Sequence, residues 1–323
     1  MAIPPALVKT ARCGWRWQWQ QLMGGLGPAD SDGNYRRPSG DHPSAALPAQ
    51  PVEGRLAEHR CILILGRSCP WAHRTWLVHT VRQLGGSLNL LMAKADHQGG
   101  RWQLDPPWRN CNTLLELYRH CGASPSYRAT VPVLVDPLER RILGNESAQL
   151  VQLLNRWPAA ADAPDLEPED LKTTISDWQK LLQTDVNDGV YRCGFARTQV
   201  AYDRAEAALF NALEQVDNSL GSHGPWLCGD RLTLADLRLF PTLIRWETVY
   251  APLFGCSRQP LWQLPNIWRW RQQLLALPGV LATCDAKAWR HDYFGALFPL
   301  NPGGIVPAGP ELSTLVNSGV PTP

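Results

Sequence analysis

The stretch Cys61-Ile62-Leu63-Ile64-Leu65-Gly66-Arg67-Ser68-Cys69-Pro70-Trp71-Ala72 predicts a strand, a turn and the start of a helix. Its apolar run is short and ends at a glycine, which favours a fully buried strand over half a helix. Pro70 suits the first turn of a helix, where its missing N–H is no loss. The predicted helix ends near Leu84, just before two consecutive glycines.

This arrangement places the sulfur of Cys69 at a helix N-terminus. Backbone N–H groups and the positive end of the helix dipole favour a thiolate there over a thiol. We therefore expect a nucleophilic thiol whose pKa lies below the free value of about 8.5. The alternative is an inert buried thiol that occupies the cap position by chance.

The fourth position of this motif decides what such a nucleophile can do. In Cys-x-x-Cys oxidoreductases a second thiol resolves the mixed disulfide within the protein, and Ala72 cannot do so. An external thiol must therefore resolve it. Glutathione is the abundant candidate in a reducing cytoplasm.

Composition excludes several classes of function. The 323 residues include 31 basic and 29 acidic ones, for a formal net charge of +2, without a long block of like charge. This predicts no nucleic-acid partner and no anionic membrane partner. Residues 1–6 lack a signal-peptide pattern, and no apolar run approaches the ~20 residues of a membrane span. We expect a globular cytoplasmic protein of about two domains.

The cysteines and histidines give no metal-binding or disulfide pattern. The nine cysteines are scattered, with no pair at two-residue spacing, and the eight histidines include no His-x-x-x-His pair. His73 follows Cys69 by one helical turn, and we interpret it as a residue on the helix surface or beside the site. No metal is expected.

Strand and helix signals alternate between residues 58 and 157, which we interpret as one domain behind a mostly irregular N-terminal arm of residues 1–57. After the first strand and helix come a strand, a polar segment, a helix, two strands in a hairpin and a last helix, at residues 88–93, 99–102, 113–121, 130–136, 141–143 and from 145. The order βαβαββα is typical of a thioredoxin-like domain.

Pro132 lies inside an otherwise good strand, where it removes a hydrogen-bond donor. In the thioredoxin-like arrangement such a proline is cis and turns the backbone of the preceding residue, Val131, toward the cysteine. The alternative is an ordinary trans proline on an edge strand.

From residue 158 to residue 323 the strand signals stop, and we predict an all-helical domain with an irregular C-terminal tail. Amphipathic spacing predicts helices at residues 169–185, 197–220, 233–250 and 266–277. Thr233 and Asp236 form a capping box in the broad sense at the start of the third.

Four motifs, at residues 68–75, 187–196, 237–245 and 301–310, carry a resemblance to a known family. A thioredoxin-like half with one such cysteine, followed by an all-helical half with a Thr-x-x-Asp box, resembles the cytosolic glutathione transferases. The four motifs, in the same order, are similar to those of the glutathionyl-hydroquinone reductases, the Xi class, over residues 32–310. The resemblance implies an α+β / α architecture, the cytosolic glutathione-transferase fold, assembled as a homodimer.

The resemblance also implies a set of site residues. Cys69 would be the nucleophile and Tyr191 the proton donor, while Tyr250 and Tyr293 would help to hold the thiolate. The glutathione site would consist of Trp102, Arg128, Ala129, Thr130, Val131, Pro132, Glu146 and Ser147. The residue types agree, since a γ-glutamyl carboxylate suits the N-terminus of the helix opened by Glu146 and Ser147. One departure is that the family's His-Tyr-Tyr reads His291-Asp292-Tyr293 here.

The implied activity is the glutathione-dependent reduction of glutathionyl-hydroquinones to hydroquinones through a mixed disulfide on Cys69. Glutathione would be the co-substrate and a quinone-derived small molecule the substrate. A first alternative is an omega-like thioltransferase or dehydroascorbate reductase, which needs Cys69 but not Tyr191. A second is a non-catalytic interaction module of the same fold.

Overall fold

The computed structural model describes residues 3–38, 46–96 and 100–317. Its first half contains a six-stranded mixed sheet in the order β4-β3-β2-β1-β5-β6. The strands are β1 (Cys61–Gly66), β2 (Leu88–Asp96), β3 (Arg101–Trp108), β4 (Cys111–Thr113), β5 (Val133–Asp136) and β6 (Arg141–Gly144).

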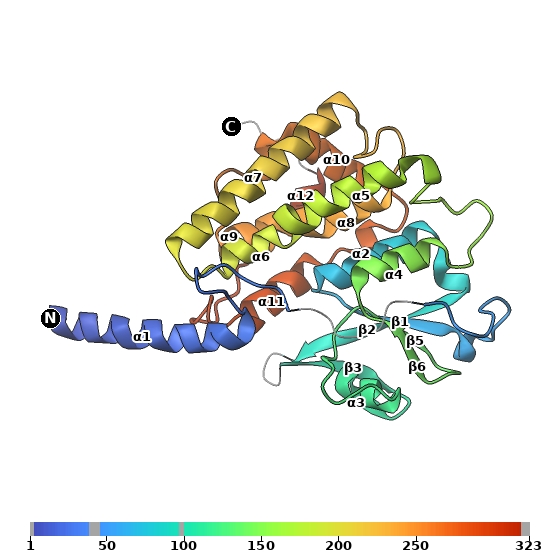
Figure 1. The fold of residues 1–323 in the computed structure, drawn as a ribbon, viewed down its shortest axis with the longest axis horizontal. Coiled ribbons are helices and arrows are strands. Elements are labelled where there is room, and N and C mark those ends of the chain that lie inside the picture. Colours follow the sequence, from blue (N-terminus) through green and yellow to red (C-terminus); the bar gives the residue numbers. More distant parts are fainter. Residues whose placement is uncertain (1–2, 39–45, 97–99, 318–323) are drawn as a thin grey trace.

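Strand β1 lies in the middle of this sheet. It pairs in parallel with β2, with Leu63 opposite Leu90, and antiparallel with β5, with Leu63 opposite Leu134. All six of its residues are buried, which explains why its sequence is apolar throughout rather than alternating. Helices α2 (Pro70–Val81) and α4 (Ser147–Asn155) lie on the sheet face toward the helical half, and α3 (Leu114–His120) lies on the other face (Figure 1).

The sheet has two strands that the sequence did not predict. Strand β3 pairs antiparallel with β2, with Ala93 opposite Leu104, and β4 continues the edge. Most of β3 is exposed, with Leu104 as its buried residue, so it lacks the apolar alternation that marks a strand. The polar segment predicted at residues 99–102 is therefore in part strand, and its residue 99 lies outside the described residues.

The second half is helical, as predicted. Its elements are α5 (Lys172–Leu181), α6 (Gly189–Gly194), α7 (Gln199–Ser222), α8 (Leu234–Leu243), α9 (Ala251–Phe254), α10 (Pro265–Leu275), α11 (Ala286–Ala296) and α12 (Leu312–Asn317), with π-helical turns at Leu182–Asn187 and Trp246–Tyr250. The capping box of Thr233 and Asp236 is confirmed at the start of α8. Helices α11 and α12 lie in the tail that was expected to be irregular, which corrects that expectation.

The N-terminal arm also differs from the prediction. A 22-residue helix, α1 (Pro5–Leu26), occupies much of it and projects away from the body (Figure 1). The Gly and Pro content of the arm as a whole concealed a helical run that begins with Pro5 at its first turn and stops before Gly27. After α1 the described part of the arm returns along the body, where Arg197 Nη2 donates to Gly27 O at 2.8 Å. The boundaries 58–157 and 158–323 remain a proposal.

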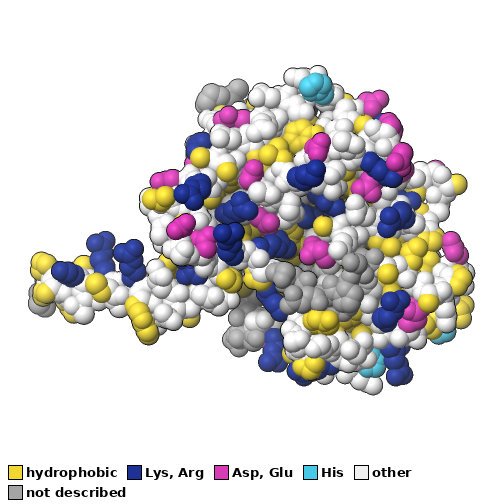
Figure 2. All heavy atoms as spheres, in the orientation of Figure 1, with side chains coloured by type: hydrophobic (Ala, Val, Ile, Leu, Met, Phe, Trp, Pro, Cys, Tyr) yellow, Lys and Arg dark blue, Asp and Glu magenta, His cyan; other side chains and the backbone are white. Residues whose placement is uncertain are grey.

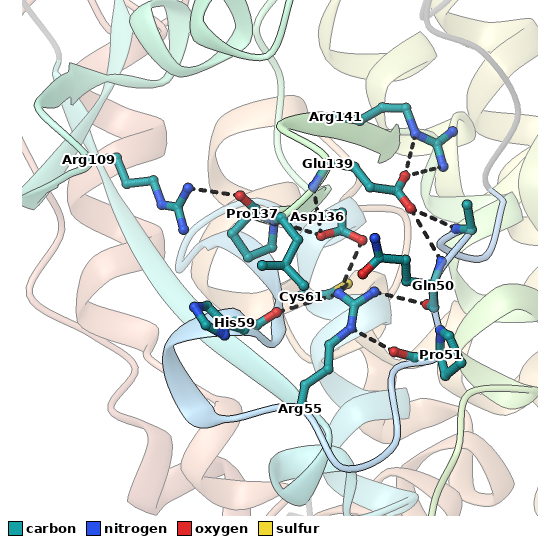
Figure 3. Close-up of polar contacts among 12 residues, drawn as sticks. Gln50, Pro51, Arg55, His59, Cys61, Arg109, Asp136, Pro137, Glu139 and Arg141 are labelled. Carbon is teal, nitrogen blue, oxygen red and sulfur yellow. Dashed lines mark hydrogen bonds and ion pairs between the residues drawn. The ribbon is translucent and has the colours of Figure 1, made fainter.

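A buried ion pair joins the segment before β1 to the β5–β6 hairpin (Figure 3). Arg55 Nη1 lies 3.1 Å from Asp136 Oδ2, and their side chains are 6% and 0% exposed. The other Asp136 oxygen accepts the N–H groups of Leu138 and Glu139. Arg55 also donates to the carbonyls of Gln50 and Pro51. Both charges are thus compensated inside the fold.

No helix among the described residues is both long enough and apolar enough to cross a membrane.

Candidate active site

Cys69 is the N-cap residue of α2, where the turn after β1 delivers it as predicted. Its thiol donates to Val131 O at 3.6 Å, and Val131 lies just before β5. The Val131–Pro132 peptide bond is cis, which confirms that prediction. The sulfur therefore lies between the start of α2 and the segment that leads into β5.

The protonation of this sulfur differs from the expectation. Burial raises the pKa of the Cys69 thiol, while the N–H groups of Ala72 and Trp71 and the cations Arg245 and Arg37 lower it. Burial prevails, so the expected lowered pKa is wrong for this structure. The helix N-terminus acts on the sulfur in the predicted direction, but it does not outweigh the loss of solvent.

Three tyrosines from separate elements form one cluster. Tyr191 comes from α6, Tyr250 from the π-helical turn before α9, and Tyr293 from α11. The Tyr191 and Tyr293 hydroxyls are 2.6 Å apart, and those of Tyr250 and Tyr293 are 3.3 Å apart. Tyr293 thus joins the other two, even though Asp292 precedes it where the family motif has a tyrosine. Within the described residues no hydrogen bond joins these hydroxyls to the Cys69 sulfur.

The electrostatics of the cluster keep its phenols neutral. Burial raises the pKa of Tyr191 and of Tyr293 well above the usual value. Tyr250 and Tyr293 raise the pKa of Tyr191 further, and Tyr250 raises that of Tyr293, whereas the hydrogen bond with Tyr191 lowers it. Burial also raises the pKa of Tyr250, and a charge on Cys69 would add to this effect. Tyr191 is only partly buried, whereas Tyr250 is fully buried and Tyr293 is 9% exposed. The cluster can therefore donate protons, and Tyr191 is its accessible end.

A pocket of about 260 Å³ opens over Cys69 and Tyr191. Nine of the predicted site residues line it: Cys69, Trp102, Arg128, Thr130, Val131, Pro132, Glu146, Ser147 and Tyr191. Ala129, Tyr250 and Tyr293 do not line it. The structure adds six residues that the sequence analysis missed, namely Leu26, Tyr35, Arg37, Pro38, Trp71 and Asn145.

One end of the pocket has the character of a carboxylate site. Ser147 is the first residue of α4, and its buried hydroxyl has no hydrogen-bond partner in the described part of the chain. Glu146 caps the helix by accepting the Ala148 N–H at 3.4 Å. Asn145 bonds the Tyr118 and Thr130 hydroxyls, which holds the approach to this helix in place. A free hydroxyl at a helix N-terminus suits an anion, and the Glu146 carboxylate suits an amine beside it.

Trp102 forms a wall of the same pocket. It lies in β3 opposite Ala95 of β2, and its ring covers Gly66 at the end of β1. A Cβ atom at Gly66 would collide with this ring. The glycine that ends the apolar run thus also makes room for the aromatic wall.

Comparisons with known proteins match this arrangement. Residues 199–273 match the family model "Glutathione S-transferase, C-terminal domain". The chain is 34% identical over 259 residues to the glutathionyl-hydroquinone reductase PcpF of Sphingobium chlorophenolicum, covering 77% of this chain and 82% of that protein. The chain belongs to the glutathionyl-hydroquinone reductase family, the Xi class of glutathione transferases.

Solved structures of this class share the fold. The glutathione-S-transferase Xi from Phanerochaete chrysosporium superposes with a TM-score of 0.79 at 30% identity, over 87% of this chain and 94% of that one. The glutathione-bound YqjG of Escherichia coli K-12 superposes with a TM-score of 0.72 at 32% identity, over 78% and 86%. The likeness includes both halves of the molecule.

In this family member the N-terminal arm contributes to the pocket. The Arg37 guanidinium lies 3.6 Å from the centre of the Trp71 ring and forms an ion pair with Asp188 at 2.9 Å. Tyr35 packs edge-on against Phe195, with 5.2 Å between the ring centres. The resemblance to the family begins at residue 32, and this was the only signal that the arm belongs to the site.

His73 and Arg245 hold the turn that carries the nucleophile. His73 is 1% exposed, so of its two expected places the helix surface is wrong and the place beside the site is the one observed. Arg245 donates to His73 Nδ1 at 2.9 Å and to Ser68 O at 3.2 Å, so the His73 Nε2–H donates to Thr283 at 2.7 Å. Burial, with help from Arg245, lowers the pKa of His73 well below its usual value. Arg245 ends one of the four family motifs, but the sequence did not indicate its role here, because its partners are remote in the chain.

Among the described residues, no three His, Cys, Asp or Glu side chains gather in a way that could hold a metal ion.

Proposed function

We propose that the protein reduces glutathionyl-hydroquinones to hydroquinones, with Cys69 as nucleophile, Tyr191 as proton donor and glutathione as the second substrate. The observation that carries this proposal is the opening of one pocket over both a thiol at a helix N-terminus and the accessible end of a hydrogen-bonded tyrosine cluster. A simple thioltransferase has no use for the second feature.

The glutathione moiety would occupy the pocket along the sheet edge. Its γ-glutamyl carboxylate would accept from the Ser147 hydroxyl and the first N–H groups of α4, and its amine would pair with Glu146. Its cysteinyl backbone would pair with the main chain at Val131, with Pro132 and Thr130 beside it. Trp102 would cover the ligand, and Arg128, with Ala129 next to it, would supply positive charge at the rim. Support comes from the lining of the pocket and from the buried, unpartnered Ser147 hydroxyl.

The first half-reaction breaks a carbon–sulfur bond. The Cys69 thiolate attacks the thioether sulfur, a disulfide forms between Cys69 and glutathione, and the bonding electrons pass to the aromatic carbon. That carbon is strongly basic and takes a proton from Tyr191, which gives the hydroquinone. Tyr293 donates to the resulting phenolate, so its 2.6 Å contact stabilises the transient charge.

The second half-reaction restores the thiolate. A second glutathione thiolate attacks the mixed disulfide, oxidised glutathione leaves, and Cys69 is reduced. The proton lost by Tyr191 is regained from solvent. The raised pKa of Cys69 means that its thiol must first lose a proton, and Arg245 and Arg37 favour the resulting charge. Tyr250 and Tyr293 would stabilise this thiolate electrostatically.

The substitution Tyr191→Phe tests the proposal. It should lower kcat for a glutathionyl-hydroquinone by about 10²–10⁴-fold, the range for a lost general acid, because a carbon leaving group needs a proton. Reduction of a small glutathione mixed disulfide should hardly change, since a thiolate leaves unaided. Cys69→Ser should abolish both activities. Unchanged glutathionyl-hydroquinone reduction by Tyr191→Phe would rule out Tyr191 as the proton donor. A wild type that reduces the mixed disulfide but not the glutathionyl-hydroquinone would identify a thioltransferase.

We also propose a cytoplasmic location and a homodimer. The location is supported by the state of the nine cysteines, which are all free, as expected in a reducing compartment. The homodimer rests on the family resemblance alone.

A further inference from the structure

Helix α1 carries an apolar stripe that the body covers only in part, at its C-terminal end. Val8, Trp15 and Leu22 recur every seven residues, and Trp19 and Leu26 follow two of them by four, so all lie on one side of the helix. At the C-terminal end Trp19 and Leu26 are partly buried against the body, and Arg197 covers the Trp19 ring at 5.4 Å. Toward the N-terminus the stripe has no partner among the residues that the structure describes. Val8 is 40% and Trp15 48% exposed, and Leu22, nearer the body, is 41% exposed.

A row of positive charge borders this stripe. Lys9, Arg12 and Arg16 are spaced by three and four residues and so share one face of α1, next to Val8 and Trp15. The helix Pro5–Leu26 contains no acidic residue to neutralise them. Figure 2 shows the projecting helix with dark-blue side chains along one edge and yellow ones along the other. The charge on α1 is thus of one sign, although the chain as a whole is almost balanced.

The apolar stripe and the basic row of α1 together indicate what kind of partner would cover the stripe. Two copies of α1 that paired along their stripes would bring their basic rows together, which is unfavourable. Basic residues beside exposed Trp and aliphatic side chains are instead the pattern of a helix that lies in the interface of a lipid bilayer. We propose that α1 binds the surface of an anionic lipid bilayer, with Val8 and Trp15 in the interface and the basic row against the headgroups.

This proposal revises the expectation that no membrane is a partner. That expectation counted charge along the chain, whereas the basic row exists only once residues 5–26 are helical. It concerns peripheral binding and requires no membrane-spanning segment. Membrane binding by α1 would also place the active site, because Leu26 at the far end of α1 lines the pocket over Cys69. A helix of ~33 Å lying on the bilayer would hold that pocket near the lipid surface.

The test is flotation of the full-length protein with vesicles. Vesicles of phosphatidylcholine with about 30 mol% phosphatidylglycerol should retain the wild type at low salt and release most of it at about 0.5 M NaCl. The variant Lys9→Glu/Arg12→Glu/Arg16→Glu should bind about 100-fold more weakly or worse. The matched control Arg119→Glu/Arg156→Glu/Lys287→Glu makes the same change in net charge on other exposed surfaces and should bind like the wild type.

The apolar contribution has its own pair of variants. Trp15→Ser should weaken binding at least 10-fold, whereas Trp17→Ser, on the opposite side of α1, should weaken it little. All variants should keep the wild-type circular dichroism and thermal midpoint, because the substituted side chains are exposed.

Three results would overturn the proposal. The first is no flotation of the wild type with anionic vesicles, and the second is equal loss of binding in the matched control. The third is a dimer, seen by sedimentation equilibrium without vesicles, that Val8→Ser/Trp15→Ser dissociates. That result would assign the stripe to a second copy of the chain. None of these readouts depends on the proposed enzymatic activity.

Discussion

Arg245 connects the second half of the chain to the turn that holds the nucleophile, and its removal should cost both stability and reactivity. The side chain is fully buried. Its guanidinium donates to Ser68 O at 3.2 Å, to Arg67 O at 3.3 Å and to His73 Nδ1 at 2.9 Å, and it lies 4.2 Å from the centre of the Trp289 ring. One residue thus fixes the backbone immediately before Cys69.

The substitution Arg245→Met keeps most of the volume and removes the donors. Arg67 O keeps a hydrogen bond from Trp289 Nε1 at 3.1 Å, but Ser68 O and His73 Nδ1 lose the donors described above. An unsatisfied buried acceptor costs ~1–3 kcal/mol, so the free energy of unfolding should fall by about 2–6 kcal/mol. Since Arg245 also lowers the pKa of Cys69, that pKa should rise in the variant.

Urea unfolding followed by circular dichroism measures the first effect, and the pH dependence of Cys69 alkylation measures the second. Arg245→Lys keeps the charge with fewer donors and should restore most of the thiol pKa but only part of the stability. Arg204→Met, at an exposed arginine, is the control and should change stability by less than about 0.5 kcal/mol. A stability of Arg245→Met within that margin, with an unchanged Cys69 pKa, would refute the reasoning.

Further predictions concern the site and the buried ion pair. Burial raises the pKa of Cys69, so its rate of alkylation should increase with pH through a midpoint above about 8.5. Peptide mass spectrometry measures this rate, and a midpoint below about 8.5 would contradict the structure. Ser147→Ala should weaken glutathione binding by about 10-fold in calorimetry through loss of one hydrogen bond to a charged group, and unchanged affinity would move the carboxylate elsewhere. Arg55→Ala leaves the Asp136 carboxylate buried without its ion-pair partner, so it should lower the free energy of unfolding by about 3–5 kcal/mol. The control Lys180→Ala removes an exposed ion pair and should lower the free energy of unfolding by less than about 1 kcal/mol.

Local sequence determined the parts of the protein that depend on neighbours in the chain. The run of residues 61–65 specified a buried strand, Pro70 specified the start of α2, and together they placed Cys69 at the helix N-terminus. Thr233 and Asp236 specified their capping box in the same way. In each case the stabilising contacts lie within a few residues, so spacing alone carries the information.

Other features depended on context that the local pattern does not contain. Strand β3, next to the edge strand β4, is mostly exposed and so shows no apolar period. Helix α1 was hidden in an arm rich in glycine and proline. The sequence predicted a nucleophile from the dipole at Cys69, but burial by distant elements reverses the net shift of its pKa.

The tertiary structure alone decided how the site is assembled. Tyr191, Tyr250 and Tyr293 span more than a hundred residues, and only the packing of α6, the π-helical turn and α11 brings their hydroxyls together. His73 and Arg245 are 172 positions apart and meet inside the protein. Hydrophobic burial drives such long-range packing without favouring one local spacing, and for that reason the sequence supplied the functional groups while the fold supplied their geometry.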